Sequence, residues 1–182
     1  MQQNKWQANK INLQIAMDNI SSYSLILGGE KALNKISQTP RLDSELLLAK
    51  VLKVDRVQFY YKDIFPEKKQ VKTYEVLLKK RMDGIPIAYL IGYKEFWSLP
   101  LKVNQDTLIP RPETEHLVQQ SLIKLDNLDK NYQILELGTG CGAVAIALAG
   151  ERPQASIIAT DLSIKALKIG KYNASKLQIG NI

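Results

Sequence analysis

A short segment with three closely spaced glycines constrains the fold of this chain more than any other feature. Gly138, Gly140 and Gly142 lie within five positions, between the apolar runs of ILELGTGCGAVAIALA (residues 134–149). Glycine adopts positive φ without steric cost and lets a ligand approach the backbone closely. A helix that follows such a loop directs its N-terminal N–H groups at the ligand. The sequence therefore predicts a ligand site at a strand–loop–helix junction.

Three classes of ligand site compete for this loop. A P-loop would end in Lys-Ser or Lys-Thr, whereas this loop ends in Cys141-Gly142-Ala143, which argues against it. A dinucleotide site fits the Gly-x-Gly-x-x-Gly/Ala pattern and the position of Asp161, 23 residues after Gly138. Glu136, two residues before Gly138, would oppose a pyrophosphate. This carboxylate favours the third class, a cofactor with a cationic amino group such as S-adenosylmethionine.

Asp161 follows a second predicted strand, in ASIIATDLS (residues 155–163), and a predicted helix comes next. Strand, glycine loop, helix, strand, acid and helix, in that order, begin a doubly wound α/β domain. Asp161 is expected to accept hydrogen bonds from ribose hydroxyls. The alternative is a helix N-cap, a role for which Ser163 competes. Cys141 is expected to serve as a small side chain of the loop, because no base lies near it in the sequence.

Residues 1–84 predict a small helical domain. Segment 10–27, with apolar Ile11 and Ile15, predicts a helix that Gly28-Gly29 ends. Segment 40–54 predicts a helix that begins at Pro40. Its expected buried stripe consists of Leu42, Leu46, Ala49, Val51 and Leu52. Segment 68–82 predicts a further helix, with Tyr74, Leu77 and Leu78 on its apolar face and Gly84 past its end.

Residues 85–130 predict a β-hairpin and a connecting helix. Two runs rich in β-branched and aromatic residues, 92–97 and 101–104, flank a turn at 98–100. Pro110 and Pro112 hold an extended approach to a helix that begins at Glu113 or Thr114 and runs to about residue 125.

The whole chain has a net charge of +7, and its positive charge is concentrated in the first half. Residues 1–85 hold 15 of the 25 Lys and Arg residues and 9 of the 18 Asp and Glu residues. A basic half suits nucleic acid or an acidic protein surface as well as it suits a solvated helical surface. No apolar run approaches the ~18 residues of a membrane span, and the N-terminus lacks a secretory signal. With Cys141 as the lone cysteine, we expect a cytoplasmic protein with no membrane contact.

Residues 84–118 (GIPIAYLIGYKEFWSLPLKVNQDTLIPRPETEHLV), followed by the glycine loop, resemble the HemK/PrmC family of peptide-chain release factor glutamine methyltransferases. The glycine loop is shared by many methyltransferases, whereas LIPRPETE (108–115) together with EFW (95–97) is more specific. RLDSELLLAKVL (41–52) also matches the family. The resemblance implies a class I enzyme that uses S-adenosylmethionine to methylate the glutamine side-chain amide in the Gly-Gly-Gln motif of release factors.

The resemblance also assigns residues. The expected cofactor-binding residues, with Glu136 included for its charge, are Glu136, Gly138, Thr139, Gly140, Cys141, Gly142 and Asp161. Those expected near the substrate pocket are Phe96, Pro110 and Arg111. No catalytic residue and no metal ion are implied. The expected partner is a release factor, nucleic acid is not expected to bind, and the chain is expected to be a monomer.

The family's Asn-Pro-Pro-Tyr motif is absent, and the sequence stops at KLQIGNI before a third strand of the α/β domain. We therefore expect a C-terminally incomplete α/β protein. Its parts are a helical bundle for substrate recognition (1–84), the hairpin and connecting helix (85–130), and the first part of a Rossmann-like methyltransferase domain (131–182). Two alternatives stay open: an adenine methyltransferase acting on nucleic acid, which LIPRPETE opposes, and a non-catalytic fragment that binds a release factor.

Overall fold

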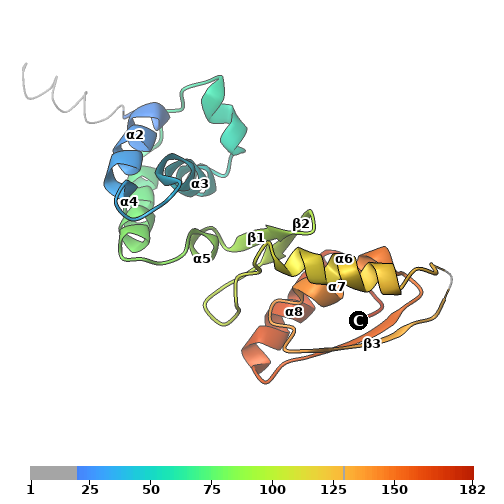
Figure 1. Cartoon of the computed structure of the whole chain (residues 1–182). Helices are drawn as coiled ribbons and strands as arrows, with labels where there is room; N and C mark the ends of the chain where they lie inside the picture. The colour runs from blue at the N-terminus through green and yellow to red at the C-terminus, as the bar shows by residue number, and fades with distance from the viewer. Residues whose placement is uncertain (1–19, 129) are drawn as a thin grey trace, which may run out of the picture. The chain divides into compact units, whose positions relative to one another are not determined.

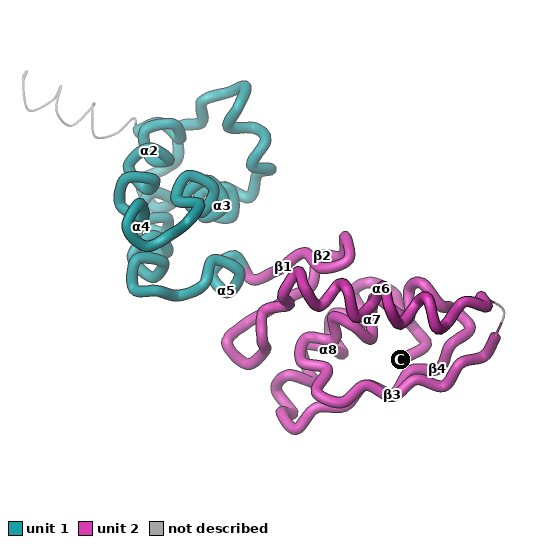
Figure 2. Tube along the Cα trace, in the orientation of Figure 1, with its two compact units in different colours: residues 1–91 teal, residues 92–182 magenta. Residues whose placement is uncertain are grey.

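The computed structural model describes residues 20–128 and 130–182 (Figure 1). The chain divides into two compact units, the first ending at Ile91 and the second beginning at Gly92 (Figure 2). A helical first part and a mixed strand–helix second part confirm the predicted α/β class with a Rossmann-like portion. Ile11 and Ile15 of the first predicted helix lie outside the described residues. Within those residues, no helix combines the length and the apolar character that a membrane span requires.

The first unit is helical, and local sequence signals set where its helices begin. Its described elements are α2 (Ser22–Leu33), α3 (Pro40–Leu52), the 3-10 helix η1 (Arg56–Tyr60), α4 (Lys68–Met82) and α5 (Ile87–Ile91). Ser21 caps α2 by accepting a hydrogen bond from Ser24 N at 3.3 Å. Pro40 occupies the first turn of α3, and Glu67 with Gln70 forms a capping box at α4.

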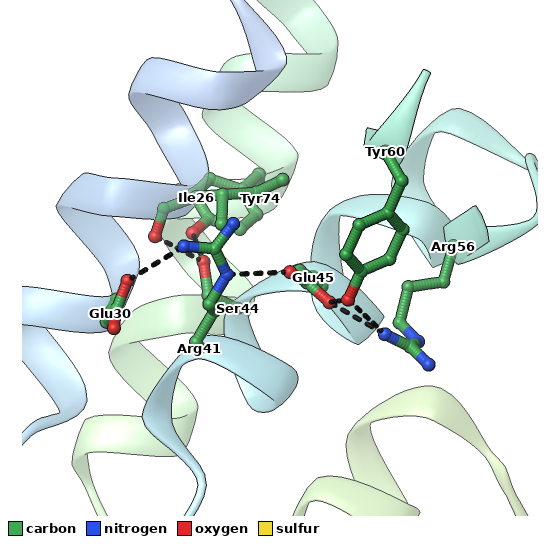
Figure 3. Close-up of polar contacts among 8 residues, drawn as sticks. All are labelled: Ile26, Glu30, Arg41, Ser44, Glu45, Arg56, Tyr60 and Tyr74. Carbon is green, nitrogen blue, oxygen red and sulfur yellow. Dashed lines mark hydrogen bonds and ion pairs between the residues drawn. The ribbon is translucent and has the colours of Figure 1, made fainter. Parts of the chain in front are cut away.

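Tyr74 of α4 lies in the core of the first unit, with only 1% of its surface exposed. Its apolar neighbours in this core are Ile26, Leu47, Leu48 and Leu90. A buried hydroxyl needs hydrogen-bond partners. Tyr74 Oη lies 2.7 Å from Ser44 Oγ, and Ser44 Oγ lies 3.0 Å from the carbonyl oxygen of Ile26 (Figure 3). Tyr74 Oη also lies 3.1 Å from the carbonyl oxygen of Leu25. Burial raises the pKa of the Tyr74 hydroxyl, so it remains neutral in the core.

The prediction that Gly28-Gly29 ends the first helix is wrong, because α2 continues to Leu33. Gly29 serves packing instead: a Cβ there would lie 2.0 Å from Tyr74 Oη and 2.4 Å from Ser44 Oγ. A Cβ on Gly28 would meet no atom within 4 Å. A glycine inside a helix costs about 1 kcal/mol relative to alanine. Close approach of α2 to the Ser44–Tyr74 pair therefore outweighs the local signal for a helix end.

The buried face of α3 also differs from the predicted apolar stripe. Leu42 is exposed, whereas the carboxylates of Asp43 and Glu45 are buried among the other helices. Buried charges are tolerated only when they are paired and hydrogen-bonded. Leu47, Leu48 and the predicted Ala49 are buried as well, so the buried face of α3 mixes apolar with polar residues, and apolar periodicity alone cannot reveal its polar members.

Arginines pair with both buried carboxylates. Glu45 accepts hydrogen bonds from Arg41 Nε at 3.1 Å and Arg56 Nη1 at 2.9 Å (Figure 3). Asp43 accepts from Arg81 Nε at 2.8 Å. These three arginines are part of the positive charge of the first half, and they act inside the unit as structural counterions.

The second unit contains the strands. Its described elements are β1 (Tyr93–Phe96), β2 (Leu99–Lys102), α6 (Thr114–Lys124), β3 (Gln133–Leu137), α7 (Ala143–Glu151), β4 (Ser156–Thr160) and α8 (Ile164–Lys176). β1 and β2 are antiparallel, and β3 and β4 are parallel. The parallel register sets Leu137 opposite Thr160, so both strands end at the glycine loop. The predicted hairpin and the strand–loop–helix–strand order are confirmed.

The hairpin turns at Trp97 and Ser98, one residue earlier than the predicted turn. Their φ angles are 52° and 58°. Positive φ at both central positions matches the twist of a two-residue hairpin, although Asn-Gly is the preferred pair. Two carboxylates hold this unusual tryptophan: Trp97 N donates to Glu115 Oε1 at 2.9 Å, and Trp97 Nε1 donates to Glu151 Oε1 at 2.8 Å. The ends of α6 and α7 thus fix the turn.

The two parallel strands bury only one face. Ile157 is buried and Glu136 is half-buried on the face toward α7. On the opposite face, Leu135, Leu137 and Ile158 are 64, 77 and 61% exposed. Among the described residues, this apolar face of the two-stranded sheet is therefore left uncovered.

We predict that Gly29→Ala lowers the free energy of unfolding by about 2 kcal/mol, because its Cβ would separate the buried hydroxyls of Ser44 and Tyr74. Gly28→Ala is the matched control and should raise it by about 0.5 to 1 kcal/mol, since alanine favours the helix and meets no atom there. Urea unfolding followed by circular dichroism measures both. Equal effects of the two substitutions would contradict this account of α2.

Candidate functional site

The loop between β3 and α7 exposes its backbone at two glycines. Gly138 and Gly140 have φ angles of 76° and 59°, a region that side chains rarely adopt. A Cβ at either position would meet no atom within 4 Å. The two glycines are therefore required by backbone conformation and not by crowding within the protein. They leave open space beside the main chain that a ligand can occupy.

Gly142 has a different role, because it is crowded by the protein itself. Its φ is 85°, and a Cβ there would lie 2.9 Å from Ile146 Cδ1 and 3.3 Å from Gly170 Cα. It is also the N-cap residue of α7. The third glycine thus allows the loop, the start of α7 and the middle of α8 to meet.

Asp161 binds the backbone of the glycine loop directly. Its Oδ2 accepts a hydrogen bond from Gly140 N at 2.8 Å, and its Oδ1 accepts one from Ser163 N at 2.8 Å. These bonds from Ser163 and Gly140 lower the pKa of Asp161, which is ionised at neutral pH. Ser163 itself caps α8 by accepting from Ala166 N at 3.2 Å. Each carboxylate oxygen can accept a further hydrogen bond, so a ligand hydroxyl has acceptors available at this position.

Glu136 ties the end of β3 to the start of α7. Its Oε2 accepts hydrogen bonds from Thr139 Oγ1 at 2.7 Å and Ala145 N at 3.0 Å. Burial raises the pKa of Glu136, and the nearby charge of Asp161 adds a smaller effect in the same direction. The sequence analysis did not predict this contact with Ala145 N, an N–H of the first helical turn that has no carbonyl partner within the helix. The signal was an acid just before a loop that leads into a helix.

Thr139 and Cys141 face inward between the glycines. Thr139 N and Gly138 N both donate to Thr160 O at 2.8 Å, which holds the loop against the end of β4. Cys141 is buried, and this burial raises the pKa of its thiol to about 11. The thiol is protonated at neutral pH and is a poor nucleophile. Its position agrees with a packing role for this small side chain.

The three residues predicted near a substrate pocket lie apart from this cluster in their contacts. Phe96 is buried within the hairpin, and Pro110 is buried in the segment before α6. The side chain of Arg111 is exposed. Among residues 20–128 and 130–182, no hydrogen bond or ion pair joins any of them to the glycine loop. The contacts thus unite the predicted cofactor residues but not these three.

Asn173 of α8 was not predicted, and it contacts both the loop and the hairpin. Its side-chain amide bonds to the backbone of Lys102 and to Cys141 O. A buried asparagine in an amphipathic helix has no distinctive sequence pattern, which explains why it was missed.

A cavity of about 430 Å³ lies beside the loop, between α7, α8 and β4. Thr139 and Gly142 reach it, and most of its lining is aliphatic, including Ile146 and Leu167. Glu136 and Asp161 do not line it. We therefore place the candidate ligand site at the open backbone of residues 138–140 beside Asp161, and not in this apolar cavity.

Similarity to known proteins extends over both units. The family described as PrmC N-terminal domain matches residues 24–92, and the family described as lysine methyltransferase matches residues 113–178. A release factor glutamine methyltransferase of Coxiella burnetii is 53% identical over 150 residues, which cover 82% of this chain and 54% of the relative. The enzyme of the same name from Escherichia coli K12 is 46% identical over 149 residues, 80% of this chain and 52% of the relative. The chain thus spans about half the length of the curated relatives that it matches.

We predict a pH-dependent gain in stability for Glu136→Gln. The raised pKa means that the folded state binds the proton of Glu136 more tightly than the unfolded chain does. This contribution is fully present below the unfolded pKa and is lost as pH rises through the folded pKa. The glutamine oxygen can accept the same two hydrogen bonds without carrying a charge. The variant should therefore gain stability over the wild type as pH rises through this window, with a constant difference above it.

Urea unfolding at intervals from about pH 4 to about pH 8 tests this expectation. Glu95→Gln, at an exposed position in β1, is the control and should show no such trend. A loss of stability in Glu136→Gln at every pH would show that the carboxylate charge itself stabilises the loop.

Proposed function

Because this chain belongs to the HemK/PrmC family of release factor glutamine methyltransferases, we propose that it serves methylation of the glutamine side-chain amide in the Gly-Gly-Gln motif of release factors. The observation that carries the proposal is the 46–53% identity, which runs through the helical unit as well as the glycine-loop unit. A likeness confined to the glycine loop would support only a methyltransferase of unstated substrate.

The proposed cofactor is S-adenosylmethionine, which supplies a methyl group on a positively charged sulfur. The open backbone at Gly138 and Gly140 gives it room, and Asp161 offers acceptors for ribose hydroxyls. Glu136 places negative charge where the cationic amino group of the methionine part would lie. No other described acid hydrogen-bonds to the backbone or side chains of residues 138–142, so these two carboxylates define the polarity of the site.

The chain's own residues would act by binding and positioning. Transfer to an amide requires that the acceptor nitrogen be held close to the methyl group in a dry pocket. We assign Phe96, Pro110 and Arg111 to the neighbourhood of the acceptor glutamine, because the segments 95–97 and 108–115 are the specific part of the family likeness. The helical part of the chain, residues 1–84, would recognise the release factor.

Titration of the chain with S-adenosylmethionine in a calorimeter tests the cofactor assignment. Asp161→Ala should weaken binding about tenfold or more, because it removes acceptors for the ribose and the bond that holds Gly140 N. Asp106→Ala is the control, since the Asp106 carboxylate pairs with Lys165 and makes no hydrogen bond to residues 138–142 among the described residues. Equal binding by the wild type and Asp161→Ala would remove Asp161 from the site.

Incubation with labelled S-adenosylmethionine, a release factor and, separately, DNA tests the substrate. Label at the glutamine of the Gly-Gly-Gln motif supports the proposal. Label on DNA adenine without label on the release factor would replace it with a nucleic-acid methyltransferase. Release-factor binding without methyl transfer would assign this chain a binding role only.

The basic surface of α4 is the proposed contact for an acidic partner. Reversing Lys68, Lys69 and Lys72 to glutamate should weaken release-factor binding about tenfold at low salt, and the loss should shrink at high salt. Reversal of Lys31 and Lys35, exposed in and just after α2, is the control. Unchanged affinity of the α4 variant at low salt would exclude this surface.

A further inference from the structure

We infer that Asn173 is a positioning residue that locks the glycine loop to the β-hairpin, so that the cofactor loop and the hairpin carrying Phe96 are held at a fixed spacing. The inference rests on the proposed function for its meaning in catalysis. The lock itself is defined by contacts within the second unit and can be tested without a ligand.

Both the oxygen and the nitrogen of the Asn173 side-chain amide form hydrogen bonds with the backbone. Its Oδ1 accepts a hydrogen bond from Lys102 N at 2.8 Å, and its Nδ2 donates to Lys102 O at 3.0 Å. This pair reproduces on a side chain the two bonds that a neighbouring strand would make with β2. The second hydrogen of Nδ2 goes to Cys141 O at 2.9 Å. One side chain thus joins the backbone of β2 to the backbone of the glycine loop.

The bond to Cys141 O is buried, because Asn173 and Cys141 are each only 2% exposed, whereas the two bonds to Lys102 are partly buried. A buried carbonyl without a donor would bear its full desolvation cost. Among the hydrogen bonds of the described residues, the one from Asn173 is the side-chain donation that satisfies Cys141 O.

The same face of α8 also contacts the loop through Gly170, one turn before Asn173. A Cβ on Gly142 would lie 3.3 Å from Gly170 Cα, and a Cβ on Gly170 would lie 3.5 Å from Gly140 O and from Gly142 N. Residues three apart share a helix face. The close approach at Gly170 and the hydrogen bond from Asn173 thus hold the loop at residues 140–142 against α8, in addition to the bond from Asp161.

Positioning at this level matters because a misplacement of about 1 Å can lower a rate about 100-fold. The loop presents Gly138 and Gly140 to the cofactor, while the buried Phe96 belongs to the hairpin that Lys102 ends. Asn173 fixes the distance between them. This role differs from that of a catalytic residue, since the side chain of Asn173 is buried and its hydrogen bonds go to backbone atoms.

Asn181 offers a matched control. Its Nδ2 donates to the carbonyl oxygens of Ala149, Arg152 and Ala155 at 3.4, 3.2 and 2.9 Å. It therefore ties backbone carbonyls together as Asn173 does, but at the connection between α7 and β4. Loss of Asn181 should destabilise the unit without releasing the glycine loop.

Amide hydrogen exchange on the full chain is the test. Asn173→Leu removes all three bonds and should speed exchange at Lys102, Gly140 and Gly142 about tenfold or more relative to the slowest-exchanging amides. Asn173→Asp keeps an acceptor for Lys102 N but donates nothing to Cys141 O. It should speed exchange at Gly140 and Gly142 while the Lys102 amide stays protected. A general loss of stability would speed exchange at Lys102 as well as at Gly140 and Gly142. The Asp variant therefore tests the inference even if the Leu variant folds poorly.

Asn181→Leu should leave exchange at Gly140 and Gly142 within about twofold of the wild type. Unchanged loop exchange in Asn173→Asp, or equal changes in Asn173→Asp and Asn181→Leu, would overturn the inference. Calorimetric titration with S-adenosylmethionine then ties the lock to the proposed function: Asn173→Asp should bind about tenfold more weakly and Asn181→Leu almost unchanged. Failure of the wild type to bind would remove the proposed cofactor, and the exchange data would still decide the lock.

Discussion

The backbone of residues 138–142 is the feature on which the second unit depends. Three left-handed glycine conformations turn the chain sharply from β3 into α7. The turned backbone is then held from several directions: by Thr160 at the end of β4, by Asp161 after it, and by Asn173 from α8. Because each of these bonds ends on main-chain atoms of the loop, the loop is already shaped before any ligand arrives. A cofactor that binds there need not order the backbone.

The first unit depends on a different kind of interaction, a polar arrangement inside a helical core. Glu45 and Asp43 are buried on α3 and are matched by arginines from α3, η1 and α4. Such pairs contribute little net stability, but removing one partner leaves an uncompensated buried charge. They therefore restrict how the helices can pack more than they add to the free energy of folding.

Much of this architecture could be predicted from the sequence where apolar periodicity and turn residues agree. The helices around Pro40, Tyr74 and the second-unit glycine loop, the hairpin and the parallel strand pair all follow from such patterns. The errors arise where a long-range contact overrides a local signal. Gly29 serves an interhelical contact, and Trp97 adopts a turn conformation because Glu115 and Glu151 hold its N–H groups. No local pattern contains that information.

The candidate site shows the same division. Residue types and spacing predicted that Asp161 and the glycines belong to it, and the folded chain joins Asp161 to the loop by a hydrogen bond. The sequence could not show that Glu136 also binds the first turn of α7, or that Asn173 reaches across to β2. Both contacts join segments that only the folded chain brings together.

The contact of Gly29 with Ser44 and Tyr74 has a consequence for how this sequence can change over time. The space that a methyl group at position 29 would need is filled by the hydroxyls at positions 44 and 74. A larger residue at 29 becomes acceptable only when a smaller or less polar pair replaces those two. Substitutions at these three positions, which lie far apart in the chain, are therefore coupled. Among homologous sequences the three positions should covary.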